Sequence, residues 1–192
     1  IVPEFNGFID LKLESIPQEF TNLDVLFLAT PHGTTESLIP LIQNIPIVID
    51  LSRDHRHVAG WVYGQPEWFN ENIVGATRIA APGCFATALF LGIAPMVSEN
   101  IVTSSIKVTA TTGSTGSGAT PKKTTHHPER FSNIRAYKVF KHQHIPEITT
   151  ALGYIGDKPK IDFVPVSAPS RFFQKVSSIY LVSFSLFIAF RS

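Results

Sequence analysis

The only cysteine of the 192-residue chain, Cys84, is the first residue that could carry covalent chemistry. It follows Pro82 and Gly83, directly after a predicted strand, and begins a predicted helix. A thiol at that position feels the positive end of the helix dipole and unpaired backbone N–H groups, both of which favour the thiolate. Free cysteines are also common as small buried hydrophobic residues, so position alone leaves a nucleophile and a core residue both open.

The second candidate is a short polar run, His142-Gln143-His144-Ile145-Pro146-Glu147, at the start of a predicted helix. Two histidines and a carboxylate could supply a general acid–base group and a partner that orients it. They could instead bind a metal, with Cys84 or the distant pair His126-His127 completing the ligands, or form a surface cluster. A cysteine nucleophile pairs with a histidine that is close in space rather than in sequence, which favours the acid–base interpretation.

The third candidate is the uncharged loop at residues 113–118, with the sequence GSTGSG. Its backbone N–H groups and hydroxyls would suit a phosphate or another oxyanion. The loop matches neither a P-loop nor a dinucleotide fingerprint, and a flexible connection explains its composition equally well.

The elements that must position these residues follow an α/β pattern. The apolar run at residues 25–30 predicts a parallel strand buried on both faces. Helical spacing at residues 34–44 and a second apolar run at residues 45–51 complete a βαβ unit. Ligands of such sheets bind beyond the carboxyl ends of the strands, where residues 30–33 and 50–52 lie.

The rest of the chain predicts a polar, aromatic connection at residues 54–72 and a short strand at residues 76–81. A helix is expected from Cys84, and a composition shift near residue 100 separates a nucleotide-type domain from an α+β domain. Later elements are expected as a strand, a helix and a strand at residues 105–112, 144–152 and 161–166. The uncharged run at residues 179–190 predicts a further strand, whose exposed edge would make the chain self-associate.

The composition limits the class of protein. Hydrophobic residues make up 44% of the chain and charged residues 16%, so a packed core is expected and global disorder is excluded. A net charge of +1 without a long Lys/Arg run argues against a nucleic-acid partner. A single cysteine excludes a disulfide framework and indicates a reduced compartment, the cytoplasm. No secretory signal opens the chain and its apolar run is too short to span a bilayer, so no membrane partner is expected.

Seven segments, in the same order, resemble the N-acetyl-γ-glutamyl-phosphate reductase family of arginine biosynthesis. They are LFLATPHG (residues 26–33), VIDLSRDHR (48–56), VYGQPE (62–67), APGCFATA (81–88), TGSTGSG (112–118), AYKVFKHQHIPEI (136–148) and FVPVSAP (163–169). The resemblance implies a partial Rossmann-type NADP-binding domain at residues 1–83. It also implies an incomplete α+β catalytic and dimerisation domain at residues 84–192, of the glyceraldehyde-3-phosphate and aspartate-semialdehyde dehydrogenase type.

The resemblance further implies an activity and a set of site residues. The reaction is the NADPH-dependent reduction of N-acetyl-glutamyl 5-phosphate to the 5-semialdehyde, with phosphate release through a thioester on Cys84. His144 would be the acid–base residue, with His142 and Glu147 in supporting or substrate-binding roles, and the protein would be a homo-oligomer without a metal. The cofactor would contact Thr30, Pro31, His32, Gly33, Ser52, Ser114 and Gly116.

Two alternatives stay open. The segment THHPER at residues 125–130 is similar to the related N-acetyl-aminoadipyl-phosphate reductases of lysine biosynthesis. No GxxGxxG-type turn precedes Asp24, and residues 170–192 follow the family only loosely, so the resemblance implies a chain truncated at both ends. Such a chain could also be a non-catalytic remnant of the family.

Overall fold

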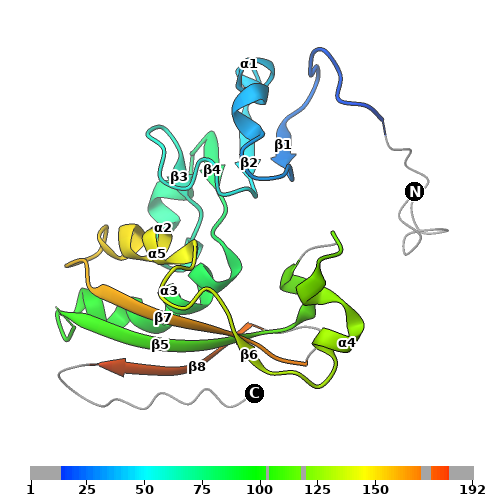
Figure 1. Ribbon diagram of the computed structural model, residues 1–192. Coiled ribbons are helices and arrows are strands. Elements are labelled where there is room, and N and C mark those ends of the chain that lie inside the picture. The colour runs from blue at the N-terminus through cyan, green and yellow to red at the C-terminus, as the bar shows by residue number, and fades with distance from the viewer. Residues whose placement is uncertain (1–13, 103, 118–119, 170–173, 182–192) are drawn as a thin grey trace.

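The computed structural model describes residues 14–102, 104–117, 120–169 and 174–181 (Figure 1). Its N-terminal sheet has four short parallel strands in the order β1-β2-β4-β3. They are β1 (Val25–Leu28), β2 (Ile47–Asp50), β3 (Val62–Tyr63) and β4 (Arg78–Ala80). The three strands predicted from apolar runs are confirmed, each ending one or two residues earlier than the runs do.

The segment between β1 and β2 is helical, as predicted, but it is not one helix. A 3-10 turn, η2 (Thr35–Leu38), precedes a single α-helical turn, α1 (Ile39–Ile42). Pro40 lies in the first turn of α1, where its missing N–H costs no helical hydrogen bond. This helical turn covers one face of β1 and β2 and forms a small core from Leu28, Ile42, Ile45 and Val48.

The prediction that β1 is buried on both faces is wrong. Leu28 is buried, but Phe27 is 61% exposed and Val25 is 39% exposed. Alternate residues of a strand point to opposite faces, and α1 packs only against the face that carries Leu26 and Leu28.

The segment predicted as an irregular connection contains two elements. It carries β3 and the helix α2 (Pro66–Ile73), which begins on a proline, the residue that best fits the first helical position. β3 joins the open edge of β4, so residues 54–72 extend the sheet rather than bypass it.

The C-terminal half forms a second, mixed sheet in the order β6-β7-β5-β8. The central pair β5 and β7 is parallel, and β6 and β8 are antiparallel to their neighbours. The bounds are β5 (Ser105–Thr112), β6 (Arg135–Ala136), β7 (Lys160–Ser167) and β8 (Gln174–Leu181). The helices are α3 (Cys84–Ser98), α4 (His127–Arg130) and α5 (His144–Leu152), and two 3-10 turns are η3 (Ser114–Ser117) and η4 (Lys123–Thr125).

The main hydrophobic core lies between this sheet and the helices α3 and α5 (Figure 1). Helix α3 is the central element, because most of its residues are apolar and eight of them are buried. Phe85, Phe90, Ile148 and Phe163 are among the largest buried side chains of this core. Helix α3 therefore joins the catalytic candidate at its first residue to the centre of the fold.

The predicted α/β class is confirmed by the parallel first sheet, the mixed second sheet and the helices that pack on them. Strand β8 includes the first three residues of the predicted strand at residues 179–190, and the remainder lies outside the described residues. In the part of the chain that the structure describes, no helix has the length and apolar character needed to cross a membrane.

Candidate active site

The nucleophile candidate lies where a parallel strand turns into a helix. Strand β4 ends at Ala80, Gly83 occupies the N-cap position of α3 and Cys84 is its first residue. Cys84 is exposed, so the alternative of a buried core cysteine is wrong. The orientation of α3 places the positive end of its dipole at the thiol.

The backbone before Cys84 is packed so closely that only glycine fits. A Cβ built on Gly83 would collide with the ring of His144 and would lie 2.8 Å from Nη1 of Arg56. His144 and Arg56 therefore rest directly on the turn that presents the thiol.

Glu147 is the buried carboxylate that connects these groups. Its Oε1 accepts hydrogen bonds from the backbone N–H of Gly83 at 2.8 Å and from the hydroxyl of Tyr63 at 3.0 Å. Its Oε2 accepts a 2.8 Å hydrogen bond from Nη1 of Arg56, while Nε of Arg56 donates to the carbonyl of Ala81 at 2.9 Å. Burial and the Glu147 carboxylate both raise the pKa of Tyr63, which keeps this phenol a donor.

His142 and His144 are both buried and pack against aromatic rings. His142 makes edge contacts with Phe85 and Phe163, and its ring centroid lies 4.8 Å from that of His144. Nε2 of His144 lies 3.9 Å from Oε2 of Glu147, and its buried Nδ1 has no hydrogen-bond partner among the described residues. Burial, together with neighbouring positive charge such as that of Arg56 beside His144, lowers the pKa of each histidine to about 4, so both rings are neutral at pH 7.

A pocket of about 620 Å³ opens over these groups. Cys84, His144 and Glu147 line it from the C-terminal half, and His32, Arg53 and Arg56 line it from the loops after β1 and β2. Cys84 and the histidine segment therefore line the same pocket, and their catalytic roles stay a prediction. No three His, Cys, Asp or Glu side chains of the described ranges come together as a metal-like cluster.

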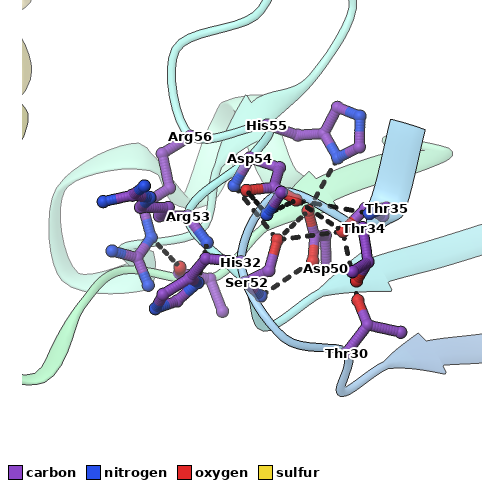
Figure 2. A network of polar contacts seen from close by, with 12 residues as sticks. Thr30, His32, Thr34, Thr35, Asp50, Ser52, Arg53, Asp54, His55 and Arg56 are labelled. Carbon is purple, nitrogen blue, oxygen red and sulfur yellow. Dashed lines mark hydrogen bonds and ion pairs between the residues drawn. The ribbon is translucent and has the colours of Figure 1, made fainter. Parts of the chain in front are cut away.

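The loops after β1 and β2 are tied together by a network centred on two aspartates (Figure 2). Asp54 accepts hydrogen bonds from the N–H of Gly33 at 2.8 Å and from the hydroxyl of Thr35 at 2.9 Å. Burial alone would raise the pKa of Asp54, but these hydrogen bonds outweigh it and lower the pKa below its ordinary value. The buried Asp50 accepts from the hydroxyl of Ser52 at 2.9 Å and contacts Nδ1 of His55 at 2.6 Å.

The seven residues predicted to contact a cofactor have different surroundings in the structure. His32 and Gly116 line the pocket that contains Cys84. The other polar groups bind elsewhere in the protein: the Thr30 hydroxyl lies 3.1 Å from that of Thr35, Gly33 and Ser52 bind aspartates, and Ser114 accepts from Arg130 at 3.1 Å. Pro31 is exposed beside His32. The cofactor role of all seven residues stays a prediction.

Sequence reasoning missed Arg53, which lines the pocket, and it also missed two partners of Glu147, Arg56 and Tyr63. Both partners lie in residues 54–72, for which the sequence predicts only a connection. Arg56 is the last residue of the segment VIDLSRDHR, and Tyr63 lies in the segment VYGQPE; both segments carry the family resemblance. These two segments could have marked Arg56 and Tyr63 as candidates, but they do not reveal that both side chains donate to Glu147.

A pH dependence of stability follows from the two buried histidines. Their pKa is 6.5 in the unfolded chain and about 4 in the folded one, so the unfolded chain binds more protons between these pH values. The stability that they contribute is fully present above pH 6.5 and is lost as the pH falls towards 4. We expect urea titrations of His144→Gln to show a smaller loss of unfolding free energy over this range than the unchanged chain.

His127→Gln is the matched control, because His127 is exposed and makes no contact with the site. This variant should keep the slope of the unchanged chain. Equal slopes for all three proteins would contradict the prediction.

Comparison with known proteins agrees with this geometry. Residues 1–76 match the model of the semialdehyde dehydrogenase NAD binding domain, and residues 84–172 match that of the semialdehyde dehydrogenase dimerisation domain. This chain belongs to the semialdehyde dehydrogenase family. The second match begins at Cys84, and residues 77–83 between the two matches contain β4 and the turn before Cys84.

Within the semialdehyde dehydrogenase family, the chain is similar to N-acetyl-γ-glutamyl-phosphate reductases. It is 42% identical over 165 residues to that of Azobacteroides pseudotrichonymphae, covering 83% of this chain and 51% of the relative. It is 34% identical over 187 residues to that of Methanococcus maripaludis strain C7, covering 88% and 54%. The resemblance drawn from the seven segments is confirmed, and the chain spans about half the length of these curated relatives.

Solved structures give the same fold. Aspartate semialdehyde dehydrogenase II from Vibrio cholerae matches with a TM-score of 0.57 at 14% identity, over 77% of this chain and 52% of that one. Aspartate semialdehyde dehydrogenase with NADP from Candida albicans matches with a TM-score of 0.55 at 12% identity, over 77% and 47%. The predicted relation to the aspartate-semialdehyde dehydrogenase fold is confirmed.

Proposed function

We propose that this chain carries the acyl-transfer site of an N-acetyl-γ-glutamyl-phosphate reductase that uses NADPH. The observation that carries the proposal is the exposed Cys84 at the start of α3, in one pocket with His144. The relatives named above all bear the glutamyl name, so the N-acetyl-aminoadipyl-phosphate alternative is not favoured.

The first half of the reaction is acyl transfer to sulfur. The Cys84 thiolate attacks the carbonyl carbon of N-acetyl-glutamyl 5-phosphate, a C–S bond forms, and phosphate leaves with the electron pair of the broken C–O bond. His144 is neutral at pH 7 and can accept the thiol proton before the attack. The product is a thioester on Cys84 and free phosphate.

The second half is reduction of that thioester. When bound, NADPH would supply a hydride, with its electron pair, to the thioester carbon. His144 can return its proton to the oxygen of the resulting thiohemiacetal on Cys84 and take it back as the C–S bond breaks. This releases the semialdehyde and regenerates the Cys84 thiolate.

The described residues fit part of a dinucleotide site. Arg53 contributes a positive charge to the pocket that contains Cys84. His32 contributes an imidazole ring, and Gly116 contributes backbone that no side chain covers. These groups suit a phosphate-bearing ligand that must place a reactive ring beside the thiol. Arg53, His32 and Gly116 are the residues that would hold the cofactor.

We propose the domain boundary between Gly83 and Cys84, with a partial NADP-binding domain at residues 1–83 and a catalytic and dimerisation domain at residues 84–192. The two separate sheets and the dimerisation name of the second matching model support this division and a homo-oligomer. The single cysteine and the biosynthetic relatives support a cytoplasmic location.

The test separates acyl transfer from reduction. The full chain is incubated with N-acetyl-glutamyl 5-phosphate and analysed by mass spectrometry for an acyl group on Cys84, then NADPH oxidation is followed by absorbance. We expect the thioester to form, and Cys84→Ser to lose both the thioester and the NADPH oxidation. A folded chain that forms no thioester would overturn the proposal and favour a non-catalytic remnant, and preference for the aminoadipyl substrate would overturn the substrate.

A further inference from the structure

The Glu147 carboxylate poses an electrostatic problem for a nucleophilic Cys84. Oε1 of Glu147 accepts the N–H of Gly83, the residue immediately before the thiol, so a buried negative charge lies at the start of α3. A negative charge near a thiol disfavours the thiolate, because two like charges in a poorly solvated site repel each other.

The positive charge of Arg56 compensates the negative charge of Glu147. Its guanidinium is 8% exposed and donates to Oε2 of Glu147 at 2.8 Å, and it also donates to the carbonyl of Ala81 on the other side of the same turn. Arg56 therefore binds the Ala81 carbonyl and Glu147 binds the Gly83 N–H, and together the two side chains form an ion pair without net charge. Arg56 lies in the loop after β2 and Glu147 lies in α5, and the two residues are 91 positions apart in the sequence.

Tyr63 completes the arrangement. Its hydroxyl donates to Oε1 of Glu147 at 3.0 Å, the same oxygen that accepts the Gly83 N–H, and the side chain is 5% exposed. A hydroxyl donor withdraws charge from that oxygen and fixes its position relative to the turn.

We propose that Arg56 and Tyr63 are positioning residues that act on Cys84 through Glu147, holding this carboxylate on the Gly83 N–H while cancelling its charge beside the thiol. The proposal rests on the proposed role of Cys84 as a nucleophile. It assigns to Glu147 a contact with the protein backbone rather than with substrate.

Other ionisable groups also face Glu147. The groups of the described chain that interact with its charge come from the loop after β2, from β3 and from the start of α5: Arg56, His57, Tyr63, His142 and His144. Burial lowers the pKa of the three histidines, so Arg56 is the permanent positive charge in this group.

The test measures the rate at which iodoacetamide alkylates Cys84 as a function of pH, with substitution variants of the full chain. Cys84 is the only thiol, so the rate reports on it alone. Arg56→Gln leaves Glu147 uncompensated and should slow alkylation at pH 7 about ten-fold, because the unpaired carboxylate disfavours a second negative charge on the nearby sulfur. Glu147→Gln removes the negative charge and should instead speed alkylation.

These opposite directions distinguish charge compensation from a merely structural role, which would change both rates in the same sense. The double variant Arg56→Gln, Glu147→Gln should return to within about two-fold of the unchanged chain, since the charge at the turn is again balanced. Rates that shift together, or a double variant as slow as Arg56→Gln, in chains with unchanged circular dichroism, would overturn the proposal.

Tyr63→Phe tests the same idea without removing a charge. It keeps the ring contact with Phe69 and loses only the donor to Glu147, so alkylation should slow about two- to three-fold. Tyr154→Phe is the matched control, because Tyr154 also packs on Phe69 but its hydroxyl contacts His57, and its rate should not change. Equal rates for both tyrosine variants would overturn the role of Tyr63, and this holds even where Arg56→Gln does not fold.

The outcome is independent of the proposed reaction. Alkylation needs neither acyl phosphate nor NADPH, so failure of the proposed function appears as absence of a thioester while the rates still respond to Arg56 and Tyr63. Failure of this inference appears as rates that ignore both residues while the thioester forms.

Discussion

Gly83→Ala is expected to disable the site and to destabilise the fold by about 1 to 3 kcal/mol, the usual cost of forcing an extra carbon into a packed interior. The new Cβ would collide with the ring of His144 and approach Nη1 of Arg56 to 2.8 Å, so one or both must move. Displacement of Arg56 would also break its hydrogen bond to Glu147. A shift of about 1 Å in such groups lowers a rate about 100-fold, which an NADPH oxidation assay would measure.

Gly75→Ala is the control for the backbone cost of adding a side chain. Gly75 has a positive φ of 80° and nothing within 4 Å of the added carbon, so the variant should lose only about 1 kcal/mol of unfolding free energy and no activity. Removing the colliding ring should recover part of the stability, so Gly83→Ala, His144→Ala is expected to be more stable than Gly83→Ala alone. If Gly83→Ala resembled Gly75→Ala in both measurements, the close packing at this turn would be refuted.

Asp50→Ala is expected to reduce the unfolding free energy by about 3 to 5 kcal/mol, because several buried groups lose their acceptor at a cost of about 1 to 3 kcal/mol each. Asp50 is fully buried and accepts from the backbone N–H of Ser52 at 2.7 Å, from the Ser52 hydroxyl at 2.9 Å and from His55 at 2.6 Å. Alanine would leave all three groups without this acceptor, and each unsatisfied buried group is costly. Urea unfolding followed by circular dichroism gives the measurement.

Asp162→Ala provides the comparison for an ion pair near solvent. Asp162 lies 3.2 Å from the largely exposed Lys160, so its loss should cost less than about 1 kcal/mol. A similar loss for both aspartates would show that the Asp50 network contributes no more than a surface pair.

The sequence predicted those parts of the fold that depend on local signals. Apolar runs located β1 and β2, and Pro82-Gly83 marked the turn from β4 to α3, which begins at Cys84 as expected. Apolar pattern alone did not show that Phe27 is exposed, because burial of a strand face depends on which element packs against it. β3 was missed because two residues are too few to produce an alternating pattern.

The site was predicted in outline and not in its interior contacts. Residue type identified Cys84, His142, His144 and Glu147, and the pocket that contains Cys84 and His144 agrees with that choice. The partners of Glu147 could not be predicted, because Arg56 and Tyr63 are 91 and 84 positions away and only tertiary packing brings them together. Likewise, nothing in the segments around Gly33 and Ser52 reveals that aspartates of the same chain already occupy their donors.

The separation of Arg56 from Glu147 has a consequence for the order in which the molecule forms. A contact between residues 91 positions apart requires closure of a long loop, whose entropic cost must be met before the contact contributes any stability. The parallel pairing of β5 with β7 likewise joins distant parts of the chain, and α5 lies between these two strands in the sequence. We therefore expect the turn that presents Cys84 to reach its final geometry late in folding, once both sheets have formed.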